Sequence, residues 1–211
     1  TPKMFGPHCG AIVADPALLE RLSPDRIGSS IDTVPERFEP GTAPYEVLAG
    51  VTATVDYIAS LSSSGECAPH TERRARVVDA MNQIEMHERA LSDRLHTRLA
   101  DIAGVRLYGT PAQRTPTALL TVDDTGTVEL AEYLAGCGIG VSAGVFHAVG
   151  AARALGLERE GAVRIGIAAY NNINDIDAVV AAVVRFTRGQ RSTSEGHRMP
   201  VPAGTRDVRR C

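Results

Sequence analysis

One long amphipathic stretch in the middle of the chain constrains the fold most. Apolar residues recur at spacings of three and four through residues 72–102, which predicts a single α-helix with one apolar face. That face consists of Val77, Ala80, Met81, Ile84, Leu91, Leu95, Leu99 and Ile102. A helix of about eight turns is longer than most helices of globular proteins. We therefore expect it to connect two parts of the fold.

The residues before the long helix predict a short strand, two helices and a long loop. Residues 11–14 are an apolar run that suits a buried strand, and Asp15 followed by Pro16 is a typical helix start for residues 17–22. Residues 23–40 contain Pro, Gly, Ser and Asp throughout and predict a loop. Residues 44–61 carry apolar side chains at helical spacing and predict an amphipathic helix.

After the long helix the pattern changes to short strands that alternate with helices. Strands are predicted at residues 105–108, 118–122, 139–142 and 163–167. Helices are predicted at residues 128–134 and 146–157, and a last helix, capped near Asp175, is predicted to end close to Phe186. These elements form an α+β unit over residues 104–188. The remaining residues lack periodicity, and we expect a dispensable disordered tail rather than a functional basic one.

Composition and charge exclude several classes of function. The chain has 211 residues, 44% of them hydrophobic, and a formal net charge of -3. That charge gives no reason to expect nucleic acid as a partner. No apolar run approaches the roughly 20 residues that cross a bilayer. The four cysteines are far apart in sequence, without the spacing of a metal site, so we expect no metal and a soluble protein of the reducing cytoplasm.

Three separate stretches together resemble one enzyme family. The first, residues 3–12, is a lysine followed by an aromatic residue, Gly-Pro and an apolar run. The second, residues 37–44, contains Arg-Phe-Glu and then Gly-Thr. The third, residues 163–172, contains an arginine followed by Tyr-Asn-Asn. In this order and spacing they resemble the class V aminotransferases, the fold type I pyridoxal-phosphate enzymes that include the cysteine desulfurases.

The resemblance implies an α/β fold and a division into domains. It covers the C-terminal half of the family's length. Residues 1–70 would be the end of the large α/β cofactor-binding domain, residues 71–103 the connecting helix, residues 104–188 the small α+β domain, and residues 189–211 a tail. The N-terminal half of such enzymes supplies much of the cofactor cradle. We therefore expect this chain to be a fragment that is inactive alone.

The resemblance also implies a cofactor, pyridoxal 5'-phosphate, and residues that would hold it. Lys3 matches the lysine that anchors the cofactor covalently and moves protons. Gly41 and Thr42 match the Gly-Thr pair that reaches the cofactor phosphate of the neighbouring subunit in a homodimer. A hydroxyl before a helix N-terminus suits an anion. From the local sequence alone, Thr42 could instead cap the helix that follows.

Two further residues match positions that face the substrate in this family. Arg164 matches the arginine that binds the substrate α-carboxylate, for which a guanidinium offers two parallel donors; otherwise it is an outward-facing strand residue. The loop of residues 142–147 matches the segment that carries the desulfurase thiol, but it contains no cysteine. Its His147 is either a general acid or base or a half-buried structural residue at a helix start. His8 is either a site residue or a turn stabiliser.

The sequence thus predicts an enzyme that acts on an amino acid by transamination, β-elimination or carbon–sulfur lysis. A cysteine desulfurase that uses another thiol is the first alternative. For that role Cys137, at the end of a helix, is a poor substitute, and Cys9 is more typical of a small buried residue. A non-catalytic regulatory or dimerisation module built on residues 104–188 is the alternative of another class.

Overall fold

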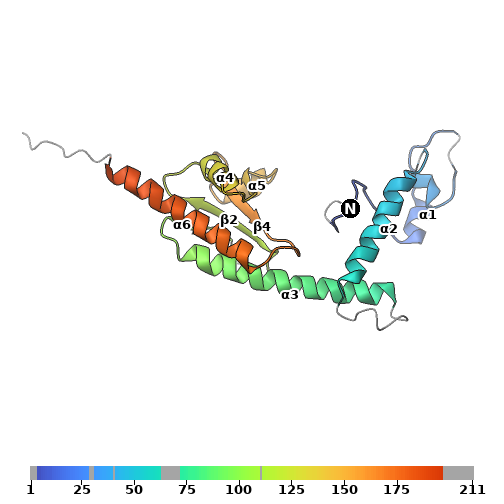
Figure 1. The fold of residues 1–211 in the computed structure, drawn as a ribbon. Coiled ribbons are helices and arrows are strands. Elements are labelled where there is room, and N and C mark those ends of the chain that lie inside the picture. Colours follow the sequence, from blue (N-terminus) through green and yellow to red (C-terminus); the bar gives the residue numbers. More distant parts are fainter. Residues whose placement is uncertain (1–3, 29–30, 40, 63–71, 110, 197–211) are drawn as a thin grey trace, which may run out of the picture. The chain divides into compact units, whose positions relative to one another are not determined.

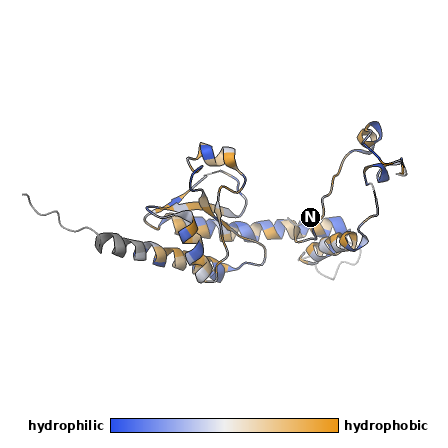
Figure 2. Cartoon of the chain, turned by 90° about the horizontal axis from the view of Figure 1, so that it is seen from above, coloured by the Kyte–Doolittle hydropathy of each residue, from blue (hydrophilic) through white to orange (hydrophobic). Residues whose placement is uncertain are grey.

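The fold is known from a computed structural model, which describes residues 4–28, 31–39, 41–62, 72–109 and 111–196, with side chains up to residue 189 (Figure 1). The chain divides into two compact units, Thr1–Gln83 and Ile84–Cys211. The boundary lies inside the longest helix, α3 (Arg73–Ala100), so α3 contributes residues to both units. Figure 2 shows that hydrophilic and hydrophobic residues both occur along this helix, as its sequence pattern requires.

The described residues of the first unit form helices and loops. Helix α1 (Pro16–Arg21) begins as predicted, because Asp15 Oδ1 accepts a hydrogen bond from Ala17 N at 2.7 Å. A single 3-10 turn, η2 (Glu36–Phe38), interrupts the loop that follows. Helix α2 (Tyr45–Ser60) confirms the predicted amphipathic helix. Two polar contacts join the end of α2 to the start of α3: Ser62 donates to Asp79, and Arg73 pairs with Asp56 at 3.0 Å.

The second unit contains a four-stranded antiparallel sheet in the order β1-β2-β4-β3. Its strands are β1 (Val105–Leu107), β2 (Thr117–Val122), β3 (Ser142–Gly144) and β4 (Ala162–Gly166). The described helices of this unit, besides the end of α3, are α4 (Thr127–Gly136), α5 (Val149–Ala154) and α6 (Ile173–Gly196).

One face of the sheet carries the main hydrophobic core. Alternate residues of β2 and β4, such as Leu120 and Val163, are fully buried and pack against α3, α4 and α6. The helices contribute residues such as Leu95, Leu134 and Val183, each also fully buried. Burying each of these side chains contributes about 2 kcal/mol, so this layer fixes the register of the strands.

The second face of the sheet is covered less completely. A small apolar cluster consists of Ala152, Leu157 and Ala162, with Tyr108, Leu119 and Val145 packed against it. This cluster brings α5 and the segments beside it onto the sheet. Arg164 of β4 and Thr121 of β2 lie on the same face, because residues two apart along a strand point the same way.

The predicted strand at residues 11–14 is wrong. These residues adopt no regular structure, and the side chains of Ile12 and Val13 are 93% and 96% exposed. A strand needs a neighbour to pair with, and the described residues of the first unit include no other strand. The apolar run predicted a strand, but the described residues of this unit contain no second strand with which it could pair.

Three boundaries in the second unit also differ from prediction. The third strand is Ser142–Gly144 rather than residues 139–142, because Gly138 turns the chain and Ile139 N bonds back to Leu134 O at 2.9 Å. Helix α5 is shorter than residues 146–157, since two residues before it have positive φ. Helix α6 continues past Phe186 to Gly196. The predicted tail beyond residue 196 lies outside the described residues.

Within the described part of the chain, none of the helices combines the length and the apolar character that crossing a membrane requires.

Candidate active site

Strand β4 presents Arg164 on the less covered face of the sheet. Its neighbours Val163 and Ile165 are 0% and 4% exposed and enter the core, so the side chain between them points to the opposite face. Arg164 pairs in register with Leu119 of β2 and Ser142 of β3. The backbone of Arg164 is therefore held between two strands, while its side chain is exposed.

The turn between β3 and α5 places an aromatic ring beside this arginine. The guanidinium carbon of Arg164 lies 4.6 Å from the centroid of the Phe146 ring. At that distance the cation is attracted to the π-electrons of the ring. Phe146 and His147 both have left-handed backbone, with φ of 54° and 58°, which is uncommon for residues other than glycine.

The charge of Arg164 has no counter-ion among the described residues. None of their carboxylates lies within ion-pair distance of its guanidinium, and none of their acceptors takes a hydrogen bond from it. Arg94, in the same unit, differs: it bonds both carboxylate oxygens of Asp177 at 2.9 Å. The donors of the Arg164 guanidinium are thus unused among the described residues.

His147 is exposed and precedes α5, which begins at Val149 after an Ala148 cap. The alternative of a half-buried histidine at a helix start is therefore wrong. Its ring has no hydrogen-bond partner among the described residues. It follows Phe146 directly, so an imidazole stands one residue from the ring that contacts Arg164.

In the first unit, Gly41 and Thr42 precede α2. Gly41 has φ of 95° and is exposed, and an added Cβ there would meet no atom within 4 Å. Thr42 does not cap the helix: the N-cap residue is Pro44, and no side chain caps this end. The capping alternative is thus wrong. The hydroxyl of Thr42 and the first amides of α2 remain as donors that suit a phosphate.

Lys3 lies outside the described residues. The segment that follows it is described, and it packs against α2: a Cβ on Gly50 would lie 3.1 Å from Pro7 Cγ. The chain that leaves Lys3 and the helix that follows Thr42 therefore belong to one packed unit. His8 is exposed, and its role stays open.

Arg37 lies at the centre of a polar network in the same unit. It donates to the backbone oxygens of Glu20, Leu22 and Asp32 at 3.2, 3.3 and 2.9 Å. It also pairs with the carboxylates of Asp32 at 2.9 Å and Glu20 at 3.4 Å. Its side chain is only 14% exposed. This network ties the loop that leads to Gly41 onto α1.

The two described cysteines belong to different units. Cys9 belongs to the first unit, is half-buried, and donates through Sγ to Gly10 O at 3.3 Å. Cys137 is the exposed C-cap of α4, a helix that packs on the core face of the sheet. The pKa of Arg185 on α6 is raised, mainly by a hydrogen bond with the Tyr133 side chain and secondly by one with the Cys137 side chain, so Cys137 faces α6. Cys137 therefore lies across the sheet from Arg164.

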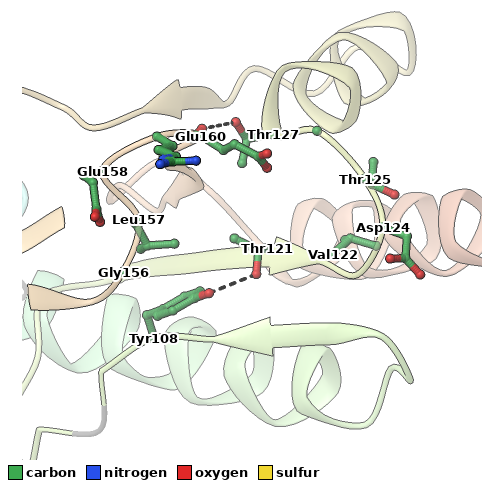
Figure 3. Close-up of a pocket in the computed structure, with 13 residues that line it drawn as sticks. Tyr108, Thr121, Val122, Asp124, Thr125, Thr127, Gly156, Leu157, Glu158 and Glu160 are labelled. Carbon is green, nitrogen blue, oxygen red and sulfur yellow. Dashed lines mark hydrogen bonds between the residues drawn. The ribbon is translucent and has the colours of Figure 1, made fainter. Parts of the chain in front are cut away.

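A cleft of about 800 Å³ also opens on the second face of the sheet (Figure 3). Its walls are held by two hydrogen bonds, from Thr127 Oγ1 to Glu160 O at 2.6 Å and between the Tyr108 and Thr121 hydroxyls at 3.2 Å. Its charged lining residues are Asp124, Glu158, Arg159 and Glu160. With three carboxylates and one guanidinium, this cleft disfavours a carboxylate ligand, so Arg164 remains the better site for one.

Sequence reasoning missed Phe146 and the acidic cleft. The aromatic residue beside His147 is visible in the sequence, but its contact with Arg164 depends on a left-handed backbone that no sequence pattern signals. Among the described residues, no group of three or more His, Cys, Asp or Glu side chains is placed to hold a metal ion.

The fold and these residues define a class: an antiparallel α+β domain with an exposed arginine that has no counter-ion among the described residues, and a unit of helices and loops that shares the long helix α3 with it. The family description "Aminotransferase class-V" matches residues 2–179. The chain therefore belongs to the class V aminotransferase family, whose cofactor is pyridoxal phosphate. The predicted family, fold class and cofactor are confirmed.

Curated relatives agree with this assignment. A probable cysteine desulfurase of Pseudomonas putida is 32% identical over 148 residues, covering 70% of this chain and 31% of the relative. Probable cysteine desulfurase 1 of Mycobacterium leprae is 30% identical over 190 residues, covering 89% of this chain and 29% of the relative. This chain thus spans about a third of the length of these relatives.

Solved structures show the same likeness. The cysteine desulfurase CsdA of Escherichia coli matches with a TM-score of 0.70 and 25% identity, covering 87% of this chain and 43% of that one. A cysteine desulfurase of Thermococcus onnurineus shares the fold, with a TM-score of 0.63 and 21% identity over 79% of this chain and 40% of that one.

Proposed function

We propose that this chain supplies the substrate-carboxylate site of a pyridoxal-phosphate enzyme that acts on an amino acid. The observation that carries the proposal is that the side chain of Arg164 is exposed and without a counter-ion among the described residues, while its backbone is held between two neighbouring strands. An arginine with that environment binds a carboxylate through paired charge-assisted hydrogen bonds.

When bound, pyridoxal phosphate would act as an electron sink for the carbanion at the substrate α-carbon. Lys3 would hold the cofactor covalently. Thr42 and the uncapped N-terminus of α2 would bind the phosphate of the cofactor that the neighbouring subunit holds, and Gly41 leaves open space beside them. The donors of this segment fit such a group, because a hydroxyl and helix amides complement an anion without a titrating charge.

Arg164 would orient the substrate by its carboxylate, which restricts the substrates to amines that bear one. His147, exposed and one residue from Phe146, would move a proton at a substrate atom beyond the α-carbon, where β-elimination or carbon–sulfur lysis needs an acid. Transamination needs only the lysine as proton carrier, so the role of His147 depends on the reaction.

Two measurements test the proposal: whether the cofactor attaches to the protein, and which substrates the protein then converts. Both use the longest polypeptide that carries this sequence. Treatment with pyridoxal phosphate and borohydride is expected to leave a stable adduct on Lys3, found by peptide mapping. A set of amino acids and their decarboxylated amines is then assayed for ammonia, sulfide and keto acid. A colourless protein that ignores the cofactor would instead support a non-catalytic α+β module.

Cysteine desulfurase activity is the second candidate, because the relatives named above bear that description. The loop of residues 142–147 contains no thiol, and Cys137 lies on the other side of the sheet from Arg164. We therefore favour a reaction without a protein persulfide. Incubation with cysteine and mass spectrometry of the Cys9 and Cys137 peptides tests this choice, since a persulfide there establishes the desulfurase.

Three further expectations accompany the proposal. We expect the 211-residue chain to be inactive alone, the enzyme to be a homodimer whose Thr42 reaches the partner's cofactor, and its location to be cytoplasmic. Turnover by the isolated chain, or a monomer in sedimentation of the loaded protein, would contradict the first two.

A further inference from the structure

The turn between β3 and α5 is strained in a way that local sequence does not require. Gly144, Phe146 and His147 have φ of 122°, 54° and 58° within four residues. Two non-glycine residues in succession with left-handed backbone are rare, and they persist only where the surrounding structure holds them. Strained backbone of this kind often holds a particular side chain in place, so the side chains of this turn are of interest.

The turn rests directly on the connection that leads into β4. A Cβ on Gly161 would lie 2.3 Å from the carbonyl carbon of Gly144 and 2.5 Å from its Cα. Gly144 also pairs in register with Ala162, the residue after Gly161. The end of β3, from which the turn leaves, and the residue before β4 therefore approach each other more closely than any side chain at position 161 would permit.

The strained turn directs one aromatic ring at Arg164. The Phe146 ring centroid lies 4.6 Å from the guanidinium carbon, and Phe146 itself is half-buried. A benzene ring attracts the cation but offers no lone pair to its N–H groups. It thus restrains the long, flexible arginine side chain while leaving all five donors for a ligand.

We propose that Phe146 is a positioning residue that fixes the Arg164 guanidinium for a substrate carboxylate, and that the strained turn seated on Gly161 exists to hold it there. This inference rests on the proposed function, because it names the residue that holds Arg164 in position for the substrate carboxylate. A restrained guanidinium loses less conformational freedom on binding, so the ring contributes to affinity for the carboxylate and not to the chemical step.

The same face of the sheet offers a comparison within the chain. Arg106 of β1 lies 5.1 Å from the Tyr108 ring, so it too is an arginine above an aromatic ring. Tyr108, however, is anchored by its hydroxyl to Thr121 on the sheet itself, without a strained turn. Arg106 therefore serves as an internal control for an arginine–aromatic contact with no proposed ligand.

The first experiment needs no activity. In the full chain, labelled with ¹⁵N-arginine, the Arg164 Nε–Hε signal is assigned by its loss in Arg164→Lys and titrated with propionate, a carboxylate without an amine. We expect an upfield ring-current shift in the free protein and a further shift on binding. Phe146→Leu should abolish the ring-current shift of the free protein and weaken propionate binding about tenfold. Phe146→Tyr should preserve the shift and the affinity.

The second experiment measures turnover, so it uses the cofactor-loaded polypeptide of the functional test above rather than the 211-residue chain alone. Phe146→Leu is expected to raise KM for the amino-acid substrate about tenfold with kcat within about twofold, and Phe146→Tyr to restore KM. Phe186→Leu, in the core beside Tyr133, is the matched control, because it is expected to lower the melting temperature and Phe186 makes no ring contact with Arg164. Phe146→Met is a second variant that fills the site without a ring.

The outcomes separate this inference from the proposed function. If Arg164→Lys weakens propionate binding and raises KM but Phe146→Leu and Phe146→Met change neither, Phe146 is not a positioning residue and the function of Arg164 stands. If propionate leaves the Arg164 signal unmoved in the unsubstituted chain, both proposals are wrong. If Phe186→Leu raises KM as much as Phe146→Leu does, the effect reflects stability, and the positioning role is overturned.

Discussion

Two arginines of this chain belong to stretches that resemble the same family, yet their surroundings are opposite. Arg37, in the first unit, pairs with two carboxylates and donates to three backbone oxygens, and its side chain is 14% exposed. Arg164, in the second unit, is exposed and contacts a single aromatic ring, with no counter-ion among the described residues.

The difference separates an arginine whose donors are used within the fold from one whose donors are unused among the described residues. The donors of Arg37 are used by the loop it fastens, so its charge serves the fold. The fold instead restrains Arg164 through the backbone of β4 and the Phe146 ring and leaves its donors unused. A motif match alone would have given both residues the same weight.

The largest effect is expected at Gly161. Gly161→Ala places a Cβ 2.3 Å from the Gly144 backbone and forces an alanine to φ of 69°, so the turn must move. We expect a loss of about 3 kcal/mol in the stability of the second unit, measured by hydrogen exchange of the β4 amides. The environment of Arg37 should not change.

Gly156→Ala is the matched control for that substitution. Gly156 also has a positive φ, 71°, but an added Cβ there meets no atom within 4 Å. The backbone preference alone should cost about 1 kcal/mol. Equal losses of stability for Gly161→Ala and Gly156→Ala would show that the contact with Gly144 adds nothing to the cost of a positive φ. The close approach at Gly161 would then not be what holds the turn.

Removing the charge of Arg164 tests whether this arginine binds the substrate carboxylate. Arg164→Gln is expected to lower kcat/KM of the loaded enzyme for an amino acid about 100-fold, since two charge-assisted hydrogen bonds are lost. The rate with the decarboxylated amine should be unchanged. Arg106→Gln, on the same face of the sheet, is the control and should change neither rate.

Removing the charge of Arg37 should affect folding and not the choice of substrate. Arg37→Met is expected to lower the free energy of unfolding of the first unit by about 2 kcal/mol, because five polar contacts are lost while the partners stay solvated. Urea unfolding followed by hydrogen exchange in α1 measures it. With saturating cofactor, KM for the substrate should stay constant.

Arg26→Met provides the scale for that measurement. Arg26 pairs with Asp32 at 2.9 Å, but its side chain is 34% exposed and it makes this single ion pair. A pair of that kind contributes less than about 1 kcal/mol. If Arg26→Met and Arg37→Met destabilise the unit equally, Arg37 is an ordinary surface charge and the contrast with Arg164 is lost.

Periodicity sufficed for helices α2, α3 and α4 and for strands β1, β2 and β4. The apolar face of α3 was read from spacing alone, with Leu95 and Leu99 fully buried as that face requires. The α+β unit of residues 104–188 followed from the alternation of strands and helices, and the α/β fold class followed from the family resemblance. These features depend on repeated local patterns, which a single sequence displays directly.

Features set by tertiary contact were beyond such patterns. The run at residues 11–14 looked like a strand, but pairing needs a partner that local sequence does not specify. Helix α5 was predicted to begin at Phe146, where a positive φ excludes helix. The resemblance pointed to Arg164, and only the packing of the β3–α5 turn revealed the ring that contacts it. Sequence therefore predicted the residue, and structure its environment.

The smallest expected effect concerns Thr42, which shares the first unit with Arg37. Its hydroxyl does not cap α2, so Thr42→Val should leave the stability of the unit unchanged and should weaken pyridoxal-phosphate binding about fivefold, the effect of one lost hydrogen bond. Thr42→Ser should bind normally. Thr52→Val is the control within α2, because Thr52 donates to Leu48 O at 3.2 Å. Cofactor titration by absorbance measures each affinity. Unchanged binding by Thr42→Val would mean that this hydroxyl serves neither cap nor phosphate, and the segment before α2 would then offer the partner's cofactor only backbone donors.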